Sequence, residues 1–236
     1  MLIVRWVLDG TRLAQPAADN RIGRSTAYRY LHEGIDVLAE RAPGLRGALL
    51  AARAAGHTHL TVDGTLIRTD RVGVPGPTAR TDRSGRRVDL WWPGKHAAHG
   101  GNIQVIAAPD GWPIWTSHVR PGREHDTTAL HAHPEALPAL AEWTDAPHAA
   151  LADLGYEGER GALTCPITHS AQRPLTADER CVNLQHAAVR APAERGNSLR
   201  KTSFKALRRV SPCRWRIGAI TAAALVLLHH VHDRTT

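Results

Sequence analysis

The stretch HLTVDG, residues 59–64, predicts a short strand that ends on a carboxylate, Asp63, followed by Gly64 as a strand terminator. The stretch HAALAD, residues 148–153, predicts a second strand that ends at Asp153. Parallel neighbouring strands would bring both aspartates to one edge of a sheet. The alternative is that each Asp only shapes a turn beside a glycine, and the 22 acidic residues of the chain allow many other combinations.

Strand and helix patterns alternate over the rest of this region, which predicts an α/β fold. Residues 70–90 are rich in Arg, Gly, Pro, Thr and Asp without periodicity, and they predict a flexible basic loop. Further strands are expected over 102–108 and 112–119, joined by a Pro109-Asp110-Gly111 turn, and over 163–167. Helices are expected over 45–55, 127–141, 178–189, from Pro192 to residue 210, and over 217–230.

The first 45 residues predict two helices around a tight turn, which is the helix-turn-helix pattern. The helices are expected over 11–20 and 26–39, with Ile22-Gly23 in the turn and Ser25 as the N-cap of the second helix. An ordinary helical hairpin is the alternative. The second helix would bury Ala27, Leu31, Ile35 and Leu38 and would present Arg24, Thr26, Tyr28 and Arg29 to a DNA groove.

Two features of this segment conflict with a complete module. Pro16 falls about one turn inside the first expected helix, where it would cost about 3 kcal/mol. Apolar residues begin at Leu2 with little before them, which favours a truncated N-terminal domain.

The chain of 236 residues carries 30 Lys and Arg against 22 Asp and Glu, a net charge of +8. Such a balance favours a polyanionic partner, although only three of the basic residues are Lys, which also fits a GC-rich genome. Residues 190–216 hold nine basic residues against Glu194 alone, so the excess is concentrated there. Because a compositional bias would spread arginines evenly, this distribution favours a nucleic-acid backbone near Glu194.

The three cysteines, Cys165, Cys181 and Cys213, lie far apart, which argues against a disulfide scaffold and a structural zinc site. The longest apolar run, 217–228, is shorter than the ~20 residues of a spanning helix. The N-terminus lacks a convincing signal peptide. We therefore expect a cytoplasmic protein without a membrane partner.

Several stretches, in the expected order, resemble the DDE transposases of the insertion sequence 5 family, also labelled DDE superfamily endonuclease. The resemblance implies an RNase H-like catalytic domain over 57–236, a mixed five-stranded sheet flanked by helices. It also implies a helix-turn-helix DNA-binding domain over 1–45, with a linker helix over 46–56. The stretches that carry it are STAYRYLHEGIDVLAE (25–40), HLTVDGTLI (59–67), GKHAAHGGNIQVIAAPDGWPIW (94–115), GREHDTTAL (122–130), ADLGYEG (152–158) and APAERGNSLRKTSFKALRR (191–209).

The same resemblance implies a catalytic triad of Asp63, Asp153 and Glu194 that holds two Mg²⁺ or Mn²⁺ ions. Arg190 and Lys201 occupy the family's positions for an Arg and a Lys around the glutamate, and we expect them to bind DNA. Seven residues are two helical turns, so Lys201 shares a helix face with Glu194 and could hold a phosphate there. Where the related pattern has a Tyr, this chain has Ala187.

Other candidate residues leave alternatives open. Lys95, His96 and His99 match a family segment, and we expect Lys95 and His96 to contact DNA; a metal site there lacks a third soft ligand. The pair His125-Asp126 also matches the family, but its role is open, since Asp126 is equally a good N-cap for the helix from Thr127. Trp91-Trp92 is either core or a platform for an unpaired base.

Together these features predict a bacterial insertion-sequence transposase. We expect it to bind terminal inverted repeats and target DNA as a homodimer or higher multimer, in the cytoplasm at the nucleoid. Its reaction would be Mg²⁺-dependent phosphodiester hydrolysis followed by strand transfer. The alternatives are a decayed copy that binds DNA without catalysis, and a host nuclease derived from a transposase.

Overall fold

The computed structural model describes residues 2–71, 81, 85, 87–145, 147–170, 172–212 and 214–236, without the side chains of 195 and 197–202. Most of the loop expected over 70–90 lies outside the described residues. Within its described part, Thr81 and Arg87 form an isolated antiparallel bridge. Among the described residues, none of the helices has both the length and the apolar character needed to cross a bilayer.

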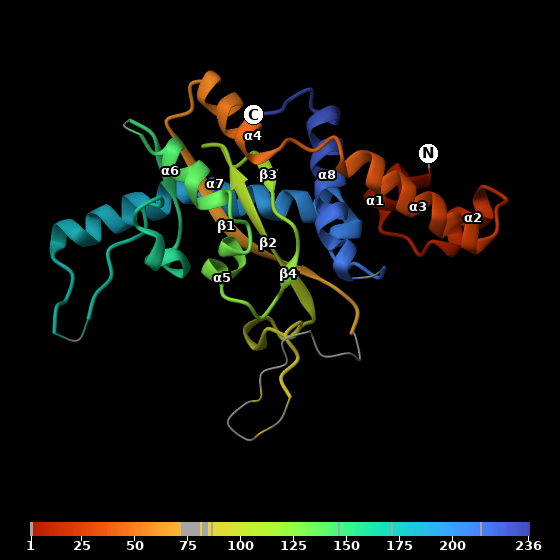
Figure 1. Ribbon diagram of the computed structural model, residues 1–236, viewed down its shortest axis with the longest axis horizontal. Helices are drawn as coiled ribbons and strands as arrows, with labels where there is room; N and C mark the ends of the chain where they lie inside the picture. Colours follow the sequence, from red (N-terminus) through yellow and green to blue (C-terminus); the bar gives the residue numbers. More distant parts are fainter. Residues whose placement is uncertain are drawn as a thin grey trace.

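A mixed sheet of five strands forms the centre of the molecule (Figure 1). Its order is β3-β2-β1-β5, with β4 paired to β2, and β1 is parallel to β5 and antiparallel to β2. The predicted α/β class and the mixed five-stranded sheet flanked by helices are therefore confirmed. The strands are β1 (His59–Arg68), β2 (Gly100–Ala107), β3 (Pro113–Thr116), β4 (Arg120–Pro121) and β5 (Ala149–Leu151).

Three strand predictions need correction. Gly64 does not end β1, because its pairing with Gln104 belongs to an unbroken antiparallel register that extends to Arg68. The strand expected over 112–119 is shortened to β3, and the two-residue β4 lies just beyond the expected range. The strand expected over 163–167 is reduced to a single parallel bridge between Thr164 and Leu151.

Each face of the sheet has its own hydrophobic core, because successive strand residues point to opposite faces. One core joins Leu60 and Ile106 to the helices α4 (Leu45–Ala54), α5 (Asp126–His131) and α6 (Ala136–Trp143). The other joins Ile67 and Val105 to α8 (Ile217–Val231) and to the N-terminal helices. Since α4 lies within the first core, the segment expected as a linker helix is packed against the sheet.

The N-terminal segment forms α1 (Leu2–Asp9), α2 (Ala14–Asp19) and α3 (Arg24–Ala39). The helices lie beside α8 at one end of the molecule (Figure 1), and α3 packs directly on α8. Ala27, Leu31 and Ile35 are fully buried at this contact, as predicted, whereas Leu38 is half-buried. The division of the chain at residues 45 and 56 stays a prediction, and across the first boundary the hydrophobic core is continuous.

Two predictions for this segment are wrong in detail. The N-cap of α3 is Gly23, and Ser25 lies inside the first turn of the helix. Pro16 is the third residue of α2, because this helix begins at Ala14. In a first turn the backbone N–H has no partner within the helix, so the predicted penalty does not arise.

The C-terminal helices also differ from the prediction. The helix expected over 127–141 is broken into α5 and α6. The two helices expected on either side of Pro192 are one continuous helix, α7 (Ala177–Ser203), which crosses the molecule behind the sheet in Figure 1. Gly111 in the β2–β3 turn lies so close to the Pro192 carbonyl that a side chain at position 111 would overlap it. This close packing holds α7 against the sheet where the proline removes a helical hydrogen bond.

Candidate functional site

The parallel pair β1–β5 places Asp63 and Asp153 at equivalent positions. The last paired residues are Thr61 and Leu151, and each aspartate follows two residues later. The side chains of both are half-buried. Asp153 turns the chain out of the sheet, since its Oδ1 accepts a hydrogen bond of 2.8 Å from the Gly155 N–H and caps the 3-10 helix Leu154–Glu159. The sequence prediction of parallel neighbouring strands at this edge is confirmed.

Asp126 brings a third carboxylate to this part of the sheet. It is the first residue of α5, and the N-cap residue is His125, so of the two alternatives left open for Asp126 the N-cap role is wrong. Its carboxylate lies directly against Gly64, where an added Cβ would overlap it. Its Oδ2 lies 3.4 Å from the Cβ position of Gly155, which is also 2.8 Å from Asp153 Oδ1. The carboxylates of Asp126 and Asp153 therefore share one small region.

A chain of buried polar side chains holds Asp126 in place. Asn102 donates to Asp126 Oδ1 at 2.7 Å, and Gln104 donates to Asn102 Oδ1 at 3.0 Å. The Tyr156 hydroxyl in turn donates to Gln104 Oε1. Sequence reasoning missed this network, although polar residues at positions 102 and 104 of an otherwise apolar strand place two amides on one sheet face.

The pKa of the Tyr156 hydroxyl is affected by the negative charge of the site. Burial is the main cause that raises its pKa well above the ordinary value of 10, and the charges of Asp126, Asp63 and Asp153 raise it further. Arg190 acts in the opposite direction. The phenol therefore stays protonated and remains a hydrogen-bond donor.

Helix α7 brings a cation to Asp63. Arg190 is nine-tenths buried, and its guanidinium lies 3.9 Å from Asp63 Oδ1. Its Nε atom is buried without a hydrogen-bond partner in the described part of the chain. Glu194 follows one helical turn later, and its side chain is exposed. Lys201 lies near the end of α7, but its side chain is outside the described residues.

The structure therefore brings part of the predicted site together. Asp63 pairs with Arg190, Asp153 shares a small region with Asp126, and all four charges act on the Tyr156 hydroxyl. Among the described residues, no group of three or more His, Cys, Asp and Glu side chains is placed to hold one metal ion. The position of Glu194 on α7 is consistent with the expected order of motifs but does not complete such a group.

A cavity of about 470 Å³ opens at this edge of the sheet, and we call it the carboxylate cavity. Its wall combines Asp126 and Asp153 with the exposed side chains of Lys95 and His96, two residues expected to contact DNA. Asp63 is not part of this wall. The lining residues are Gly64–Leu66, Pro93–His96, Asn102, Gly122–Asp126, Asp153 and Gly155.

The remaining candidates lie elsewhere. His99 pairs with Asp89 at 3.0 Å and does not reach the carboxylate cavity. Trp91 is fully buried against Trp215 and Arg214, so it is a core residue, whereas Trp92 is partly exposed. His125 is exposed, and its Nδ1 lies 2.9 Å from the Thr127 hydroxyl.

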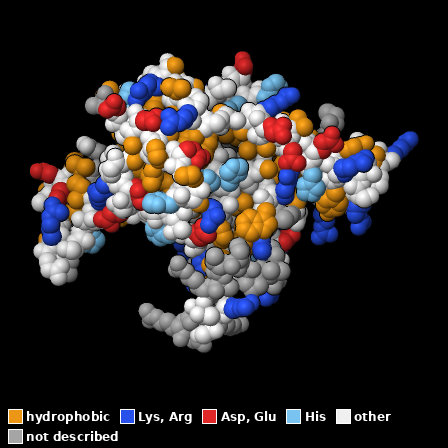
Figure 2. All heavy atoms as spheres, viewed as in Figure 1, with side chains coloured by type: hydrophobic (Ala, Val, Ile, Leu, Met, Phe, Trp, Pro, Cys, Tyr) orange, Lys and Arg blue, Asp and Glu red, His pale blue; other side chains and the backbone are white. Residues whose placement is uncertain are grey.

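The exposed face of α3 carries the residues expected to read DNA. Arg24, Arg29 and Tyr28 are exposed, the last at 44%, while Thr26 is half-buried. Arg29 lies over the ring of Tyr30. Figure 2 shows Lys and Arg side chains on the projecting end of the N-terminal helices. This end presents basic and aromatic groups to solvent.

Comparison with known proteins places most of the chain in one family. The family model described as DDE superfamily endonuclease matches residues 62–229. Among curated proteins, none matches this sequence. Three solved structures of a Mos1 transposase give weak superpositions. The paired-end complex with the left transposon end has 12% identity and a TM-score of 0.24, over 98% of this chain and 77% of that one.

The other two structures give similar values. The pre-cleavage Mos1 transpososome has 11% identity and a TM-score of 0.24, over all of this chain and 78% of that one. The Mos1 mariner paired-end complex with Mn has 13% identity and a TM-score of 0.23, with the same coverage. Scores of this size do not establish a shared fold.

Proposed function

Because the chain belongs to the DDE superfamily endonuclease family, as the match over residues 62–229 shows, we propose that it is a metal-dependent DNA endonuclease that acts as a bacterial insertion-sequence transposase. The observation that carries this proposal is the alignment of Asp63 and Asp153, each two residues beyond the last parallel pair of β1 and β5, with Arg190 beside Asp63. Four strands in antiparallel pairing, β1 to β4, and a β5 that is parallel to β1 support the RNase H-like interpretation of the sheet.

The donor set suits a hard divalent cation. Asp63, Asp153 and Glu194 would hold Mg²⁺ or Mn²⁺, two ions per site, through carboxylate oxygens, the ligands that these ions prefer. The pKa of Tyr156 is raised mainly by burial, and the further rise caused by the charges of Asp126, Asp63 and Asp153 supports this fit, because it shows that carboxylates gather near this hydroxyl. When bound, such ions neutralise charge at a scissile phosphate and make an attacking water more acidic.

The chain's own residues position the DNA. Arg190 pairs with Asp63 through its guanidinium group and would hold that carboxylate in place beside the DNA backbone. Lys95 and His96, in the wall of the carboxylate cavity, would bind the DNA backbone. Lys201, two turns beyond Glu194, would hold a further phosphate.

In this scheme a water attacks the phosphodiester bond at the end of the element. The bond to the leaving 3′-oxygen breaks, and a 3′-hydroxyl is released. That hydroxyl then attacks a phosphodiester of target DNA. The new P–O bond joins the element to the target, the target's own bond from phosphorus to its 3′-oxygen breaks, and the target strand leaves with a 3′-hydroxyl, so no covalent enzyme intermediate is needed. Recognition of the terminal inverted repeats would come from α3 through Arg24, Thr26, Tyr28 and Arg29, in a homodimer or higher multimer at the bacterial nucleoid.

One observation favours a second candidate function. The exposed Glu194 and the lack of a three-ligand group among the described residues fit a copy that binds DNA without cleaving it. A host nuclease derived from a transposase would instead keep cleavage but have no terminal repeats to recognise.

A cleavage assay on duplexes that carry the ends of the element tests these functions. We expect nicking only with Mg²⁺ or Mn²⁺, and no nicking by Asp63→Asn, Asp153→Asn or Glu194→Gln, while DNA binding is retained in all three. Metal-dependent nicking of any duplex regardless of its ends would favour the host nuclease. Binding without nicking by the unmodified chain would favour the non-catalytic copy, and nicking by one of the variants would remove that residue from the mechanism.

A further inference from the structure

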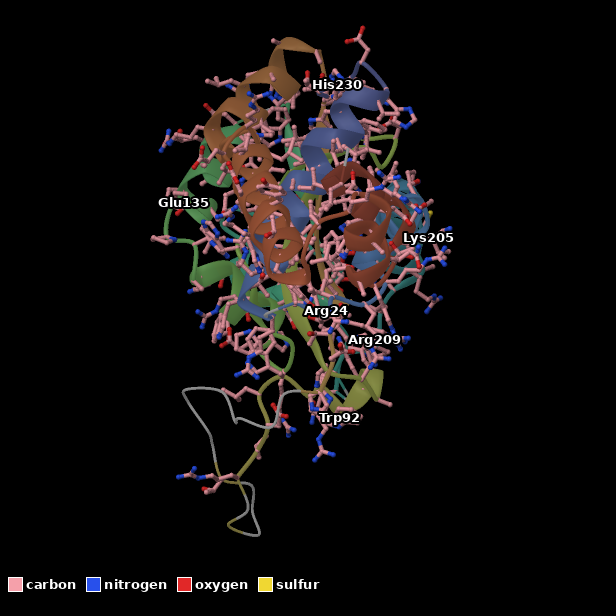
Figure 3. All side chains as sticks on the ribbon, turned by 90° about the vertical axis from the view of Figure 1, so that its right-hand side faces the viewer. Arg24, Trp92, Glu135, Lys205, Arg209 and His230 are labelled. Atoms are coloured by element: carbon pink, nitrogen blue, oxygen red, sulfur yellow. The ribbon has the colours of Figure 1, made fainter. Side chains whose placement is uncertain are left out.

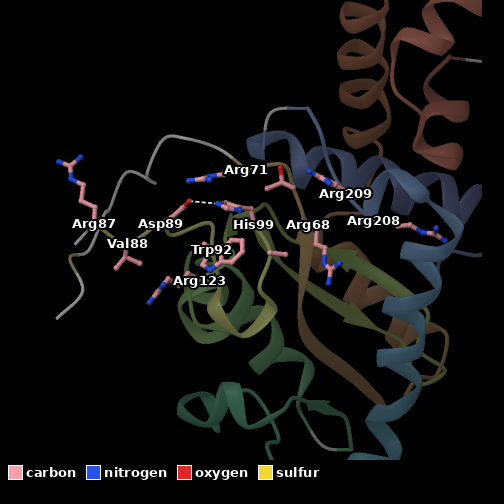
Figure 4. A pocket seen from close by; sticks show the side chains of 12 residues that line it. Arg68, Arg71, Arg87, Val88, Asp89, Trp92, His99, Arg123, Arg208 and Arg209 are labelled. Carbon is pink, nitrogen blue, oxygen red and sulfur yellow. Dashed lines mark hydrogen bonds and ion pairs between the residues drawn. The ribbon is translucent and has the colours of Figure 1, made fainter. Parts of the chain in front are cut away.

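A second and larger concave site lies next to the carboxylate cavity, and we call it the arginine pocket (Figure 4). It has a volume of about 980 Å³ and a wall drawn from four separate parts of the chain. These parts are the end of β1, the segment before β2, the turn after β4 and the segment before α8. The described lining residues are Arg68, Thr69, Arg71, Arg87–Asp89, Trp92, Ala98, His99, Arg123, Arg208 and Arg209.

The charge of this pocket is strongly positive. Six arginines line it, and the only carboxylate among its described lining residues is Asp89. Asp89 is engaged by His99 at 3.0 Å, the contact drawn in Figure 4. Arg209 also pairs with Asp70 at the rim. A concave surface of this composition concentrates anions, and guanidinium groups bind phosphate oxygens in pairs.

An aromatic side chain stands among these arginines. Trp92 is 37% exposed, and its ring is held edge-on by His99 at a centroid distance of 4.7 Å. A large apolar side chain among these arginines would add nothing to the binding of a bare phosphate. It suits a planar ring, because stacking on an aromatic face is the usual way in which proteins hold an unpaired base.

The arginine pocket and the carboxylate cavity are neighbours. Arg123 lines both of them, and the segment 92–99 supplies Trp92 and His99 to one and Lys95 and His96 to the other. In the side view of Figure 3, Arg209 and Trp92 lie near each other on the same end of the molecule. A strand that leaves the carboxylate cavity past Arg123 therefore enters the arginine pocket.

We propose that the arginine pocket binds an unpaired segment of the DNA strand next to the scissile phosphate, with its phosphates on Arg68, Arg123 and Arg209 and a base stacked on Trp92. Duplex DNA hides the faces of its bases, so only a single strand, or a duplex with an opened end, presents the base and the phosphates together. This inference rests on the proposed function for the identity of the strand.

Fluorescence anisotropy of labelled DNA tests the pocket. The assay uses the full chain in EDTA, so no cleavage contributes. A 12-nucleotide single strand, the corresponding duplex and inorganic triphosphate as a competitor are compared at one salt concentration. We expect Trp92→Ala to weaken single-strand binding by about 10-fold or more and to leave duplex binding within about 2-fold, since stacking is lost for the single strand alone. Trp92→Phe restores most of the affinity.

Two control variants separate the pocket from general effects. Trp215→Ala removes a partly exposed tryptophan outside the pocket, and Arg46→Ala removes an exposed, ion-paired arginine far from it in the sequence. Both should leave single-strand affinity unchanged, whereas Arg68→Ala and Arg209→Ala each weaken it several-fold. Circular dichroism of every variant confirms that a loss of binding is not a loss of folding.

Three results would overturn the proposal. The first is an equal effect of Trp92→Ala on single strand and duplex, and the second is no effect on either. The third is that inorganic triphosphate displaces the single strand completely, and equally well from the unmodified chain and from Trp92→Ala. That result would make the pocket an anion site only. Failure of the proposed nuclease function is distinguishable, because cleavage would then be absent while the Trp92-dependent preference for single strands persists in EDTA.

Discussion

The carboxylate cavity and the arginine pocket share Arg123 but are lined by different kinds of side chain. In the carboxylate cavity, the buried amide of Asn102 donates to Asp126. The carboxylate of Asp126 lies so close to Gly64 and Gly155 that a side chain at either position would contact it. In the arginine pocket, long exposed side chains converge from separate loops around Trp92. Short, fixed groups suit chemistry at one atom, whereas long, mobile groups suit a flexible charged polymer.

This difference has an energetic counterpart. A carboxylate held by buried hydrogen bonds loses its function when it moves by a fraction of an ångström. An exposed guanidinium contributes mainly through long-range attraction, which neighbouring arginines can partly replace. Single changes in the carboxylate cavity should therefore decrease cleavage strongly, whereas the loss of a single arginine from the arginine pocket should decrease binding only several-fold.

The largest expected effect is that of Asp126→Asn. Asparagine has nearly the same shape and can still accept the hydrogen bond from Asn102, so the substitution removes only the charge. We expect metal-dependent cleavage to decrease by about 10- to 100-fold, the usual effect of losing a group that supports a metal site. Single-turnover rates at several Mg²⁺ concentrations measure this. Unchanged rates would limit Asp126 to a structural role.

The next effect concerns space rather than charge. In Gly64→Ala the new methyl group overlaps the Asp126 carboxylate, so Asp126 must move. We expect a loss of about 1–3 kcal/mol in the free energy of unfolding, together with slower cleavage. Gly158→Ala is the matched control, because nothing lies within 4 Å of its Cβ position. Urea unfolding compares the two, and equal stability would show that the carboxylate cavity is adaptable.

A smaller effect is expected for Arg123→Ala, which alters both sites. We expect single-strand affinity to fall several-fold, and the slope of log K against log salt to decrease by about 0.7, the value for one phosphate contact to a single strand. Arg46→Ala should leave that slope unchanged. Titrations at four salt concentrations give the slopes. A decrease in cleavage without any change in slope would assign Arg123 to the carboxylate cavity alone.

The smallest expected effect concerns the hydrophobic core rather than either site, and it appears as a change in folding stability at acidic pH. His229 is buried in α8, and its Nε2 donates to the Pro113 carbonyl at 2.8 Å. Burial first, and then the charge of Arg234, lower the pKa of His229, although the bond to Pro113 opposes them. Its folded pKa is therefore below the unfolded value of 6.5, so its stabilising contribution is complete above pH 6.5 and decreases as the pH falls below it.

His229→Gln can keep the bond to Pro113 without titrating. We expect it to reduce the loss of stability below pH 6.5 by about 1 kcal/mol or less. Urea unfolding at neutral and acidic pH measures the difference. If cleavage still declines with acid in this variant, the decline belongs to the carboxylates. An unchanged loss of stability in the variant would show that His229 does not cause it.

Local sequence determined how much of this molecule could be predicted. The pairing of β1 with β5 was predictable, because both strands have short apolar patterns that end on Asp63 and Asp153. The position of Asp126 was not, since its environment depends on Gly64 and Asn102 from other strands. The arginine pocket was missed because its residues lie up to 141 positions apart, and nothing local connects Arg68 with Arg209.

The errors have similar causes. Glycine by itself favours the end of a strand, but Gly64 pairs with Gln104, and the antiparallel register continues beyond it to Arg68. Pro192 predicts a helix start, but contact with the β2–β3 turn stabilises a helix that runs through it. Glu194 could be placed on a helix by pattern alone, whereas its distance from Asp63 depends on how α7 lies across the sheet.

The contact between α3 and α8 fixes the position of α3 relative to the rest of the molecule. Arg216, at the start of α8, pairs with Asp36 at 2.7 Å and also donates to the His32 carbonyl, so the two helices are joined by charge as well as by their apolar faces. A duplex held at the exposed end of α3 would be presented to the sheet at a set offset, with no flexible tether to lengthen it. The number of base pairs between the site of recognition and the site of cutting would then be a property of the fold.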